Sequence, residues 1–246
     1  MSLTIRILGA GDAFGSGGRF QTCFLGETEG TRFLIDCGAT SLVAMKRAKI
    51  EPNEIATILL THLHGDHFGG LPFVLLDGRF SKRKTPLVIV GPRGAEARTM
   101  AVLELFYPGS TSVPFGFPVT FHALSDDRPL TVNGITATGH LVEHPSGADA
   151  FAMQVEAGGK RIGYSGDTSW CDGIVRAAEG CDLFIAEAYG WAHSRRNHLD
   201  HATLVANASK LTARRLLLTH MDEGVLAHVS ESPFEGVNDG TVVNVL

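Results

Sequence analysis

The alternation of apolar and polar positions divides the chain into short strands and amphipathic helices. Residues 3–8 alternate as a half-buried strand does, and residues 55–60 form an apolar, β-branched run typical of a buried strand. Residues 95–107 place apolar side chains, among them Leu105 and Phe106, at helical spacing. The same patterns predict further strands at 20–26, 31–36, 86–90, 160–164, 182–186, 214–218 and 241–246, and further helices at 39–49, 170–178 and 201–211.

These predicted elements form two groups of strands with helices between several of them. Residues 118–155 alternate in short runs separated by tight turns such as Asn133-Gly134. Two packed β-sheets with helices outside would bury all the apolar faces, which predicts an α/β (α+β) fold. No run of Ser, Pro or charge marks a linker, so we expect residues 1–246 to form a single domain.

Composition and charge narrow the class of protein. A hydrophobic content of 44% over 246 residues is enough for a substantial core, and a net charge of −5 argues against broad binding to nucleic acid or membrane surfaces. The N-terminus does not read as a signal peptide, and no stretch approaches the ~18 apolar residues of a membrane span. The four cysteines have no C-x-x-C spacing, so we expect free thiols in a reducing cytoplasm.

Four side chains of metal-ligand type lie within six positions, in the pattern H-x-H-x-D-H. They follow the predicted strand 55–60 and precede residues 71–76, which read as the start of a helix with Pro72 near its beginning. A lone histidine in a turn is usually structural, but so many together have no packing reason. Imidazole and carboxylate groups suit zinc, iron or manganese. The four residues are His62, His64, Asp66 and His67.

Further ligand-type residues follow other predicted strands. His144 comes after the strand 135–142, Asp167 after 160–164, and His220 after 214–218. Each alone would be more readily a turn residue. Because all of them occupy the same structural position as His62, they predict one shared site.

These motifs resemble those of the metallo-β-lactamase fold superfamily, and more narrowly its ribonuclease Z and cyclic-phosphodiesterase branch. The similarity covers nearly the whole chain and rests on Phe33-Leu34-Ile35-Asp36-Cys37-Gly38, Thr61 to Gly70, His144, Ser165-Gly166-Asp167-Thr168 and Leu218-Thr219-His220. The resemblance implies a four-layer αββα sandwich with the site at one edge of the two sheets. It also implies one metal held by His62, His64 and His144, a second held by Asp66, His67 and His220, Asp167 as the bridge, and Asp36 as an orienting residue.

The resemblance implies two divalent metal ions, with zinc preferred and manganese or iron as alternatives. Such ions, ~3.5–4 Å apart, can hold a bridging hydroxide that serves as the nucleophile. Asp66 is then both a ligand and a candidate catalytic acceptor of the water proton. Ligands shared by two ions leave positions open for water and substrate, which is typical of a catalytic site. We therefore expect a dinuclear metal-dependent hydrolase.

A leaving alkoxide also needs a proton donor. The ribonuclease Z branch has a Glu in an H-E-A-T-like segment and a His downstream of it, and Glu187 matches that Glu. The His is ambiguous: His198 fits by its spacing to His220, and His201 fits by its local sequence. We prefer His198 as the catalytic partner of Glu187 and keep His201 open, since either could simply cap the following helix.

The chain departs from ribonuclease Z between His144 and Asp167. The family inserts a long tRNA-gripping arm there, and this chain has room only for two strands and a turn. Together with the acidic net charge, this argues against pre-tRNA as a partner and favours a small anionic substrate. The leading prediction is a phosphodiesterase for a small or nucleotide-like diester. The alternatives are a carboxylic ester, thioester or lactam hydrolase on the same metals, and a non-catalytic metal-holding binding protein.

Three features stay open at this point. The glycine-rich segment Gly9–Arg19 lacks G-x-G-x-x-G before a helix, so we interpret it as a mobile loop bordering the site rather than a phosphate cradle. Basic residues at Arg79–Lys84 and Arg195–Arg196 read as solvated surface, and would favour an anionic substrate only if they face the cleft. The sequence leaves the oligomeric state open, a homodimer included.

Overall fold

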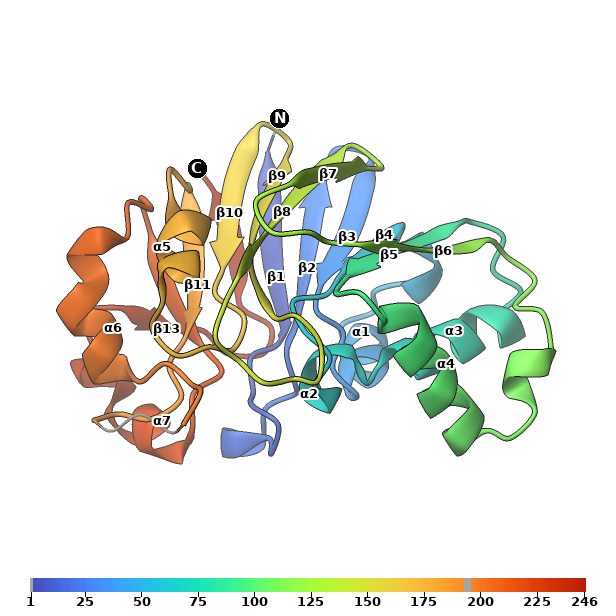
Figure 1. Cartoon of the computed structure of the whole chain (residues 1–246), viewed down its shortest axis with the longest axis horizontal. Coiled ribbons are helices and arrows are strands. Elements are labelled where there is room, and N and C mark those ends of the chain that lie inside the picture. The colour runs from blue at the N-terminus through green and yellow to red at the C-terminus, as the bar shows by residue number, and fades with distance from the viewer. Residues whose placement is uncertain (1, 193–195) are drawn as a thin grey trace.

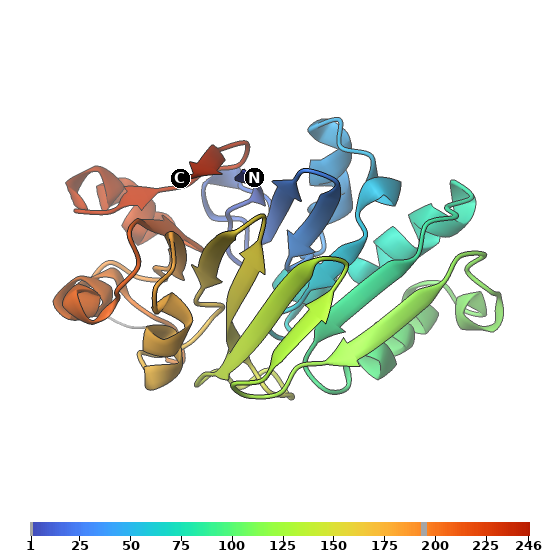
Figure 2. The same ribbon diagram turned by 90° about the horizontal axis from the view of Figure 1, so that it is seen from above.

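The structure is a sandwich of two sheets between two layers of helices. This computed structural model describes residues 2–192 and 196–246. Figure 1 shows the strands in the middle, with α5, α6 and α7 on one side and α1, α3 and α4 on the other. Figure 2, seen from above, shows the two sheets lying face to face. The predicted αββα architecture is confirmed.

The first sheet has the strand order β14-β1-β2-β3-β4-β5-β6. From β14 to β3 neighbouring strands run antiparallel, and from β3 to β6 they run parallel. Its strands are β1 (Leu3–Gly9), β2 (Cys23–Thr28), β3 (Thr31–Ile35), β4 (Thr57–Leu59), β5 (Leu87–Gly91), β6 (Val119–Ala123) and β14 (Val242–Val245).

The second sheet repeats this arrangement with the order β13-β12-β11-β10-β9-β8-β7. Strands β7 to β10 pair antiparallel, and β10 to β13 pair parallel. Its strands are β7 (Pro129–Val132), β8 (Ile135–Leu141), β9 (Phe151–Ala157), β10 (Lys160–Tyr164), β11 (Leu183–Glu187), β12 (Leu216–Thr219) and β13 (Glu235–Gly236).

Three apolar clusters hold the four layers together. Large side chains such as Phe24, Phe33 and Tyr164 fill the space between the sheets, and the rings of Phe24 and Tyr164 pack edge to face at 5.0 Å. Burying such aromatic side chains supplies much of the driving force for folding. The outer clusters join the first sheet to α1 (Ser41–Arg47), α3 (Leu71–Phe80) and α4 (Ala95–Phe106), and the second sheet to α5 (Asp172–Ala178), α6 (His201–Asn207) and α7 (Glu223–His228).

Most predicted elements are present, with shifted ends. The predicted strand 160–164 is β10, whereas the helix predicted over 39–49 is α1, which is shorter at both ends. Asn133 and Gly134 both have positive φ, as a two-residue hairpin turn requires. The turn-like helices α2 (Gly65–Phe68) and α7 were not predicted, since each is too short to show helical periodicity.

The predicted apolar face of the helix 95–107 is wrong at its C-terminal end. Leu105 is 78% exposed and Phe106 is 51% exposed. The residues that α4 buries are Ala95, Thr99 and Leu103, which lie four positions apart along one stripe. Leu105 and Phe106 lie outside this stripe and stay largely in solvent, with the ring of Phe106 stacked on that of Phe73.

None of the helices within residues 2–192 and 196–246 has the length and apolar character needed to cross a membrane.

Candidate metal centre

The predicted site residues lie where strands of both sheets end. His62 follows β4, Asp167 follows β10, and His220 follows β12, while Glu187 is the last residue of β11. His144 follows β8 on the same sheet as β10. Parallel neighbours end at the same edge of a sheet, so these side chains meet without any of them being close in sequence. The backbone N–H of Phe151 donates to Thr61 O at 3.1 Å and joins the two sheets at this edge.

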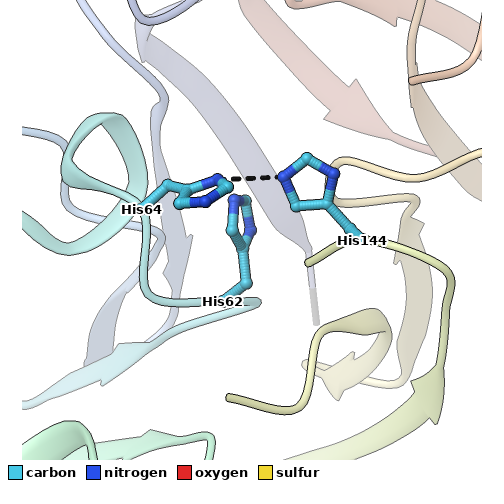
Figure 3. Close-up of side chains that lie close together, drawn as sticks. All are labelled: His62, His64 and His144. Carbon is cyan, nitrogen blue, oxygen red and sulfur yellow. Dashed lines mark hydrogen bonds between the residues drawn. The ribbon is translucent and has the colours of Figure 1, made fainter. Parts of the chain in front are cut away.

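Three imidazoles form the first cluster, which we term the three-histidine group: His62, His64 and His144. Figure 3 shows the three rings converging, with His62 between the other two. Nδ1 of His64 and Nε2 of His144 lie 2.9 Å apart, and the ring of His62 is 5.0 Å from that of His64 and 4.8 Å from that of His144. Nδ1 of His144 donates to the backbone oxygen of Asn197 at 2.8 Å, which leaves Nε2 facing the cluster.

A second cluster, which we term the Asp66 group, comprises Asp66, His67, Asp167 and His220. Asp66 Oδ2 lies 3.2 Å from His220 Nε2 and 3.4 Å from His67 Nε2. Asp167 reaches both clusters, because its Oδ1 is 3.2 Å from His67 Nε2 and its Oδ2 is 3.8 Å from His62 Nε2. All of these side chains are buried, so the carboxylate of Asp167 stands between two sets of inward-facing ligand atoms.

The short helix α2 presents Asp66 and His67 because the preceding chain packs closely against it. A Cβ on Gly38 would lie 2.3 Å from Asp66 O, and one on Gly70 would lie 2.3 Å from Gly38 O. Real Cβ atoms do not approach oxygen so closely, so both positions require glycine. The motifs Asp36-Cys37-Gly38 and Gly69-Gly70 therefore act together to place the ligand-bearing turn.

Asp36 holds the ring of His67 and the backbone of Thr61 in place beside the two clusters. Its Oδ2 accepts a hydrogen bond from His67 Nδ1 at 2.7 Å, and its carboxylate also accepts from the N–H and the hydroxyl of Thr61, each at 2.8 Å. Burial raises the pKa of Asp36, an effect that His67 partly offsets. A second carboxylate behind a ligand imidazole fixes its tautomer and leaves Nε2 facing the cluster.

The donor set fits a pair of divalent cations. Nε2 of His62 and Nε2 of His67 are buried and make no hydrogen bond, and Asp167 Oδ1 also makes none. A buried polar atom without a partner costs free energy comparable to a lost hydrogen bond, unless a ligand satisfies it. Imidazole nitrogens and carboxylate oxygens that converge in this way match the ligand chemistry of zinc and related metals.

The clustered charges shift the pKa values of the ligands in opposite directions. Burial lowers the pKa of His62 well below its usual value, and the neighbouring His67 lowers it further. Burial also opposes protonation of His220, but Asp167 and Asp66 more than offset it and raise its pKa to about 9. Burial opposes ionisation of Asp167, yet His220 and His67 hold its pKa well below the usual value. In the metal-free chain, protons on imidazoles thus balance the carboxylates.

Glu187 and His198 form a separate pair beside Asp167. His198 Nδ1 donates to Glu187 Oε2 at 2.9 Å and lies 3.9 Å from Asp167 Oδ2. The other oxygen, Oε1, accepts from the N–H groups of Thr168 and Leu199. Burial lowers the pKa of His198, but its hydrogen bond to Glu187 and the negative charges of Glu187 and Asp167 together outweigh burial and raise the pKa above its usual value. Of the two candidate histidines, only His198 contacts Glu187.

His201 has different neighbours. It is the first residue of α6, and its ring stacks on Trp191 with centroids 4.0 Å apart. Its Nε2 and Ser232 Oγ form a hydrogen bond of 2.8 Å. Tyr189, two residues after Glu187, was not singled out by the sequence, yet its ring lies 4.7 Å from that of His198 and 5.6 Å from that of His220. Its place beside Glu187 in the same segment was the only available signal.

The glycine-rich segment is bound by carboxylates rather than shaped for phosphate. Asp12 accepts from the N–H groups of Phe14 and Ser16, and Asp239 accepts from those of Ala10 and Phe20. Gly17 N donates to Glu223 Oε1 at 2.7 Å. Since these amides already have anionic acceptors, the loop offers no free cradle of the kind that binds a phosphate.

The basic cluster Arg79–Lys84 is largely structural. Arg79 donates to Ser110 O and Val113 O, and the buried Arg83 donates to four backbone oxygens, those of Pro52, Ile55, Thr85 and Pro86. Lys82 and Lys84 are exposed. Of the second basic pair, Arg196 is exposed, and Arg195 lies outside the described residues.

Comparison with known proteins shows which family the chain belongs to. A family model described as anti-Pycsar protein Apyc1 matches residues 3–238. The chain belongs to the Apyc1 family. Among curated relatives, the uncharacterized protein Rv1339 of Mycobacterium tuberculosis is 29% identical over 90% of this chain and 81% of its own length. A ribonuclease Z of Ignicoccus hospitalis is 27% identical over 87% of this chain and 86% of its own.

Solved structures share the fold of this Apyc1-family chain. The metallo-β-lactamase fold protein YhfI of Bacillus subtilis has a TM-score of 0.80 at 20% identity, with 99% of both chains covered. The short form of human tRNase Z has a TM-score of 0.79 at 23% identity, also over 99% of both chains. A diphosphatase of the PhnP family has a TM-score of 0.77 at 19% identity, over 98% of this chain and 97% of its own. The chain is a metal-dependent hydrolase with the metallo-β-lactamase fold.

Proposed function

We propose that this chain is a dinuclear metal-dependent phosphodiesterase that acts on a small, nucleotide-like diester. The observation that carries the proposal is the meeting of three groups at Asp167: the three-histidine group, the Asp66 group and the Glu187–His198 pair. The first two offer ligands for two cations, and the third offers a proton beside them. A diester hydrolase needs these two functions side by side.

His62, His64 and His144 would hold one cation, Asp66, His67 and His220 the other, and Asp167 would contact both. When bound, such a pair supplies a water nucleophile of lowered pKa and neutralises negative charge on the diester. Asp66 Oδ2 faces two imidazoles within 3.4 Å, and this carboxylate is our candidate acceptor of the proton from the attacking water. Asp36 keeps His67 Nε2 facing the site through its hydrogen bond to Nδ1.

Glu187 and His198 would deliver the proton to the leaving oxygen. The raised pKa of His198 favours its protonated form near neutral pH. Because Nδ1 is engaged with Glu187 Oε2, Nε2 carries the proton available for transfer. Glu187 is itself held by two backbone N–H groups, so it orients the imidazole and stabilises its positive charge.

The substrate is proposed to be small because no segment within residues 2–192 and 196–246 resembles an arm for a large one. Residues between His144 and Asp167 fold into a short loop followed by β9 and β10, which is the pair of strands predicted from the sequence. The relatives named ribonuclease Z and diphosphatase support a phosphate ester or anhydride as the substrate class. The net charge of −5 argues against extended contacts with a nucleic-acid backbone.

Metal analysis and a substrate comparison test this proposal. Protein purified without chelators should contain about two metal ions per chain. It should hydrolyse bis(p-nitrophenyl) phosphate in preference to p-nitrophenyl acetate, with zinc, manganese and iron tested separately. Asp167→Ala should lower turnover by orders of magnitude while the circular dichroism spectrum is retained. One metal per chain, ester hydrolysis without diester hydrolysis, or near-normal turnover of Asp167→Ala with metal retained would each contradict the proposal.

A further inference from the structure

A single guanidinium joins the two loops that carry the three-histidine group. Arg98 of α4 donates through Nη1 to Leu63 O at 3.2 Å and to Ser146 O at 2.7 Å, and through Nη2 to Gly147 O at 3.2 Å. Leu63 lies between His62 and His64, and Ser146 lies two residues after His144. Arg98 therefore fixes the separation of loops that start from different sheets.

The loop after His144 is shaped for this contact. Gly147 has a φ of +75°, and a Cβ at that position would lie 2.9 Å from Arg98 Nη2. A side chain there would be both strained and in the way of the guanidinium. The planar fork of arginine can bind several carbonyls at fixed angles, which a lysine ammonium on a flexible stem does not reproduce.

A second arginine occupies the corresponding place beside the Asp66 group. Arg19 is buried, and it donates through Nε to Ser16 O at 2.9 Å and through Nη2 to Met221 O. Met221 directly follows His220, a non-glycine residue with a φ of +52°. Such a conformation persists only where the surroundings enforce it. His220 N also donates to Ala10 O at 3.0 Å. Both ends of the glycine-rich segment are therefore hydrogen-bonded to the turn that carries His220.

We propose that Arg98 and Arg19 are positioning residues that each set the metal affinity of one half of the site. Arg98 acts on the three-histidine group through Leu63 O and Ser146 O, and Arg19 acts on the Asp66 group through Met221 O. Each of these oxygens lies within two residues of a proposed ligand. This inference rests on the proposed two-metal function. Removal of groups that orient metal ligands typically lowers metal affinity by about 10–100-fold. Replacing Arg98 should cause that loss of affinity at the three-histidine group, and replacing Arg19 should cause it at the Asp66 group.

The test measures zinc affinity by calorimetry in two variants, each of which keeps only one of the two groups of candidate ligands. His67→Ala leaves the three-histidine group, and His64→Ala leaves the Asp66 group. Arg98→Met should weaken zinc binding by about 10–100-fold in the His67→Ala background and leave it unchanged in the His64→Ala background. Arg19→Met should give the reverse pattern. Arg98→Lys should fall short of wild type, because an ammonium does not reproduce the fork.

Arg79→Met is the matched control, because Arg79 also lies on an outer helix and binds two backbone oxygens, those of Ser110 and Val113. It should leave both zinc affinities unchanged. Equal losses in both halves, or losses no larger than in this control, would overturn the proposal. If Arg98→Met does not fold, Arg98→Lys carries the same comparison. A wild-type chain that binds none of zinc, manganese and iron would refute the proposed function instead, so the two failures are distinguishable.

Discussion

At the scale of single residues, the hydrogen bond of 2.9 Å between Glu187 and His198 gives the sharpest prediction. An activated diester releases p-nitrophenolate, which barely needs a proton, whereas an alkoxide leaving group needs one. His198→Ala and Glu187→Gln should therefore lower kcat/KM on an alkyl or nucleotide diester by about 10²–10⁴-fold, and much less on bis(p-nitrophenyl) phosphate. Steady-state kinetics on both substrates measure the difference.

His201→Ala is the control for this comparison, because His201 contacts Trp191 and Ser232 and makes no contact with Glu187 in the described structure. Its effect on kcat/KM should be the same for both leaving groups. Equal losses on both substrates in His198→Ala would mean that His198 shapes or binds rather than donates. A loss of kcat/KM on the alkyl or nucleotide diester alone, seen in His201→Ala and not in His198→Ala, would mean that His201 is the proton donor.

The imidazoles of the Asp66 group predict proton release when metal binds. The pKa of His220 is raised to about 9, so this imidazole is protonated at pH 7.5 in the metal-free chain. Despite burial, the pKa of His67 is also raised well above its usual value, by the carboxylates of Asp167, Asp66 and Asp36, which favours its protonated form. A metal ligand must be neutral at the binding nitrogen, so zinc has to displace these protons. Zinc affinity should therefore rise with pH through about 9, where His220 loses its proton. Calorimetry in buffers of different ionisation enthalpy counts the protons; a release of none at pH 7.5 would contradict this charge arrangement.

At the scale of elements, the start of α6 depends on one cap. Asp200 accepts from Thr203 N at 2.8 Å and from Thr203 Oγ1 at 2.7 Å, and so satisfies an N–H that the helix itself leaves unpaired. Asp200→Ala should lower the free energy of unfolding by about 1 kcal/mol, whereas Asp200→Ser should retain most of it because Ser also caps well. Chemical denaturation measures both variants. Equal losses for Ala and Ser would mean that the cap is not what Asp200 contributes.

At the scale of the whole molecule, the packed layers protect three of the four free cysteines. Burial raises the pKa of the Cys23 and Cys181 thiols to about 12 and that of Cys37 well above its usual value. Alkylation needs a thiolate that reagent can reach, so iodoacetamide at pH 8 should modify Cys171 alone. Mass spectrometry should show one adduct in the native protein and four after denaturation. Native labelling of Cys37, which packs beside α2, would reveal opening at the edge of the metal centre.

Local pattern was enough to predict the layers, and together with the family resemblance it picked out residues that the fold brings into clusters. Alternation such as that of residues 3–8 follows from strand geometry. His62, Asp167 and His220 each come shortly after a strand with a parallel neighbour, and such strands end at a common edge of the sheet. The four-residue helix α2 was missed because one turn carries no periodicity, even though Asp66 and His67 within it were singled out as candidate ligands. The predicted face of α4 failed because apolar spacing does not say how wide a stripe its neighbours cover.

The sequence by itself determined which kinds of side chain stand at the strand ends, because residue type and strand periodicity are local properties. Only the tertiary structure decided which histidine meets Glu187, because His198 and His201 are three residues apart and differ in the direction that the loop before α6 gives them. Only the tertiary structure placed Arg98 between the loops of His64 and His144. Its acceptors are backbone oxygens, which every residue possesses, so no residue type or spacing in the sequence could have indicated that contact.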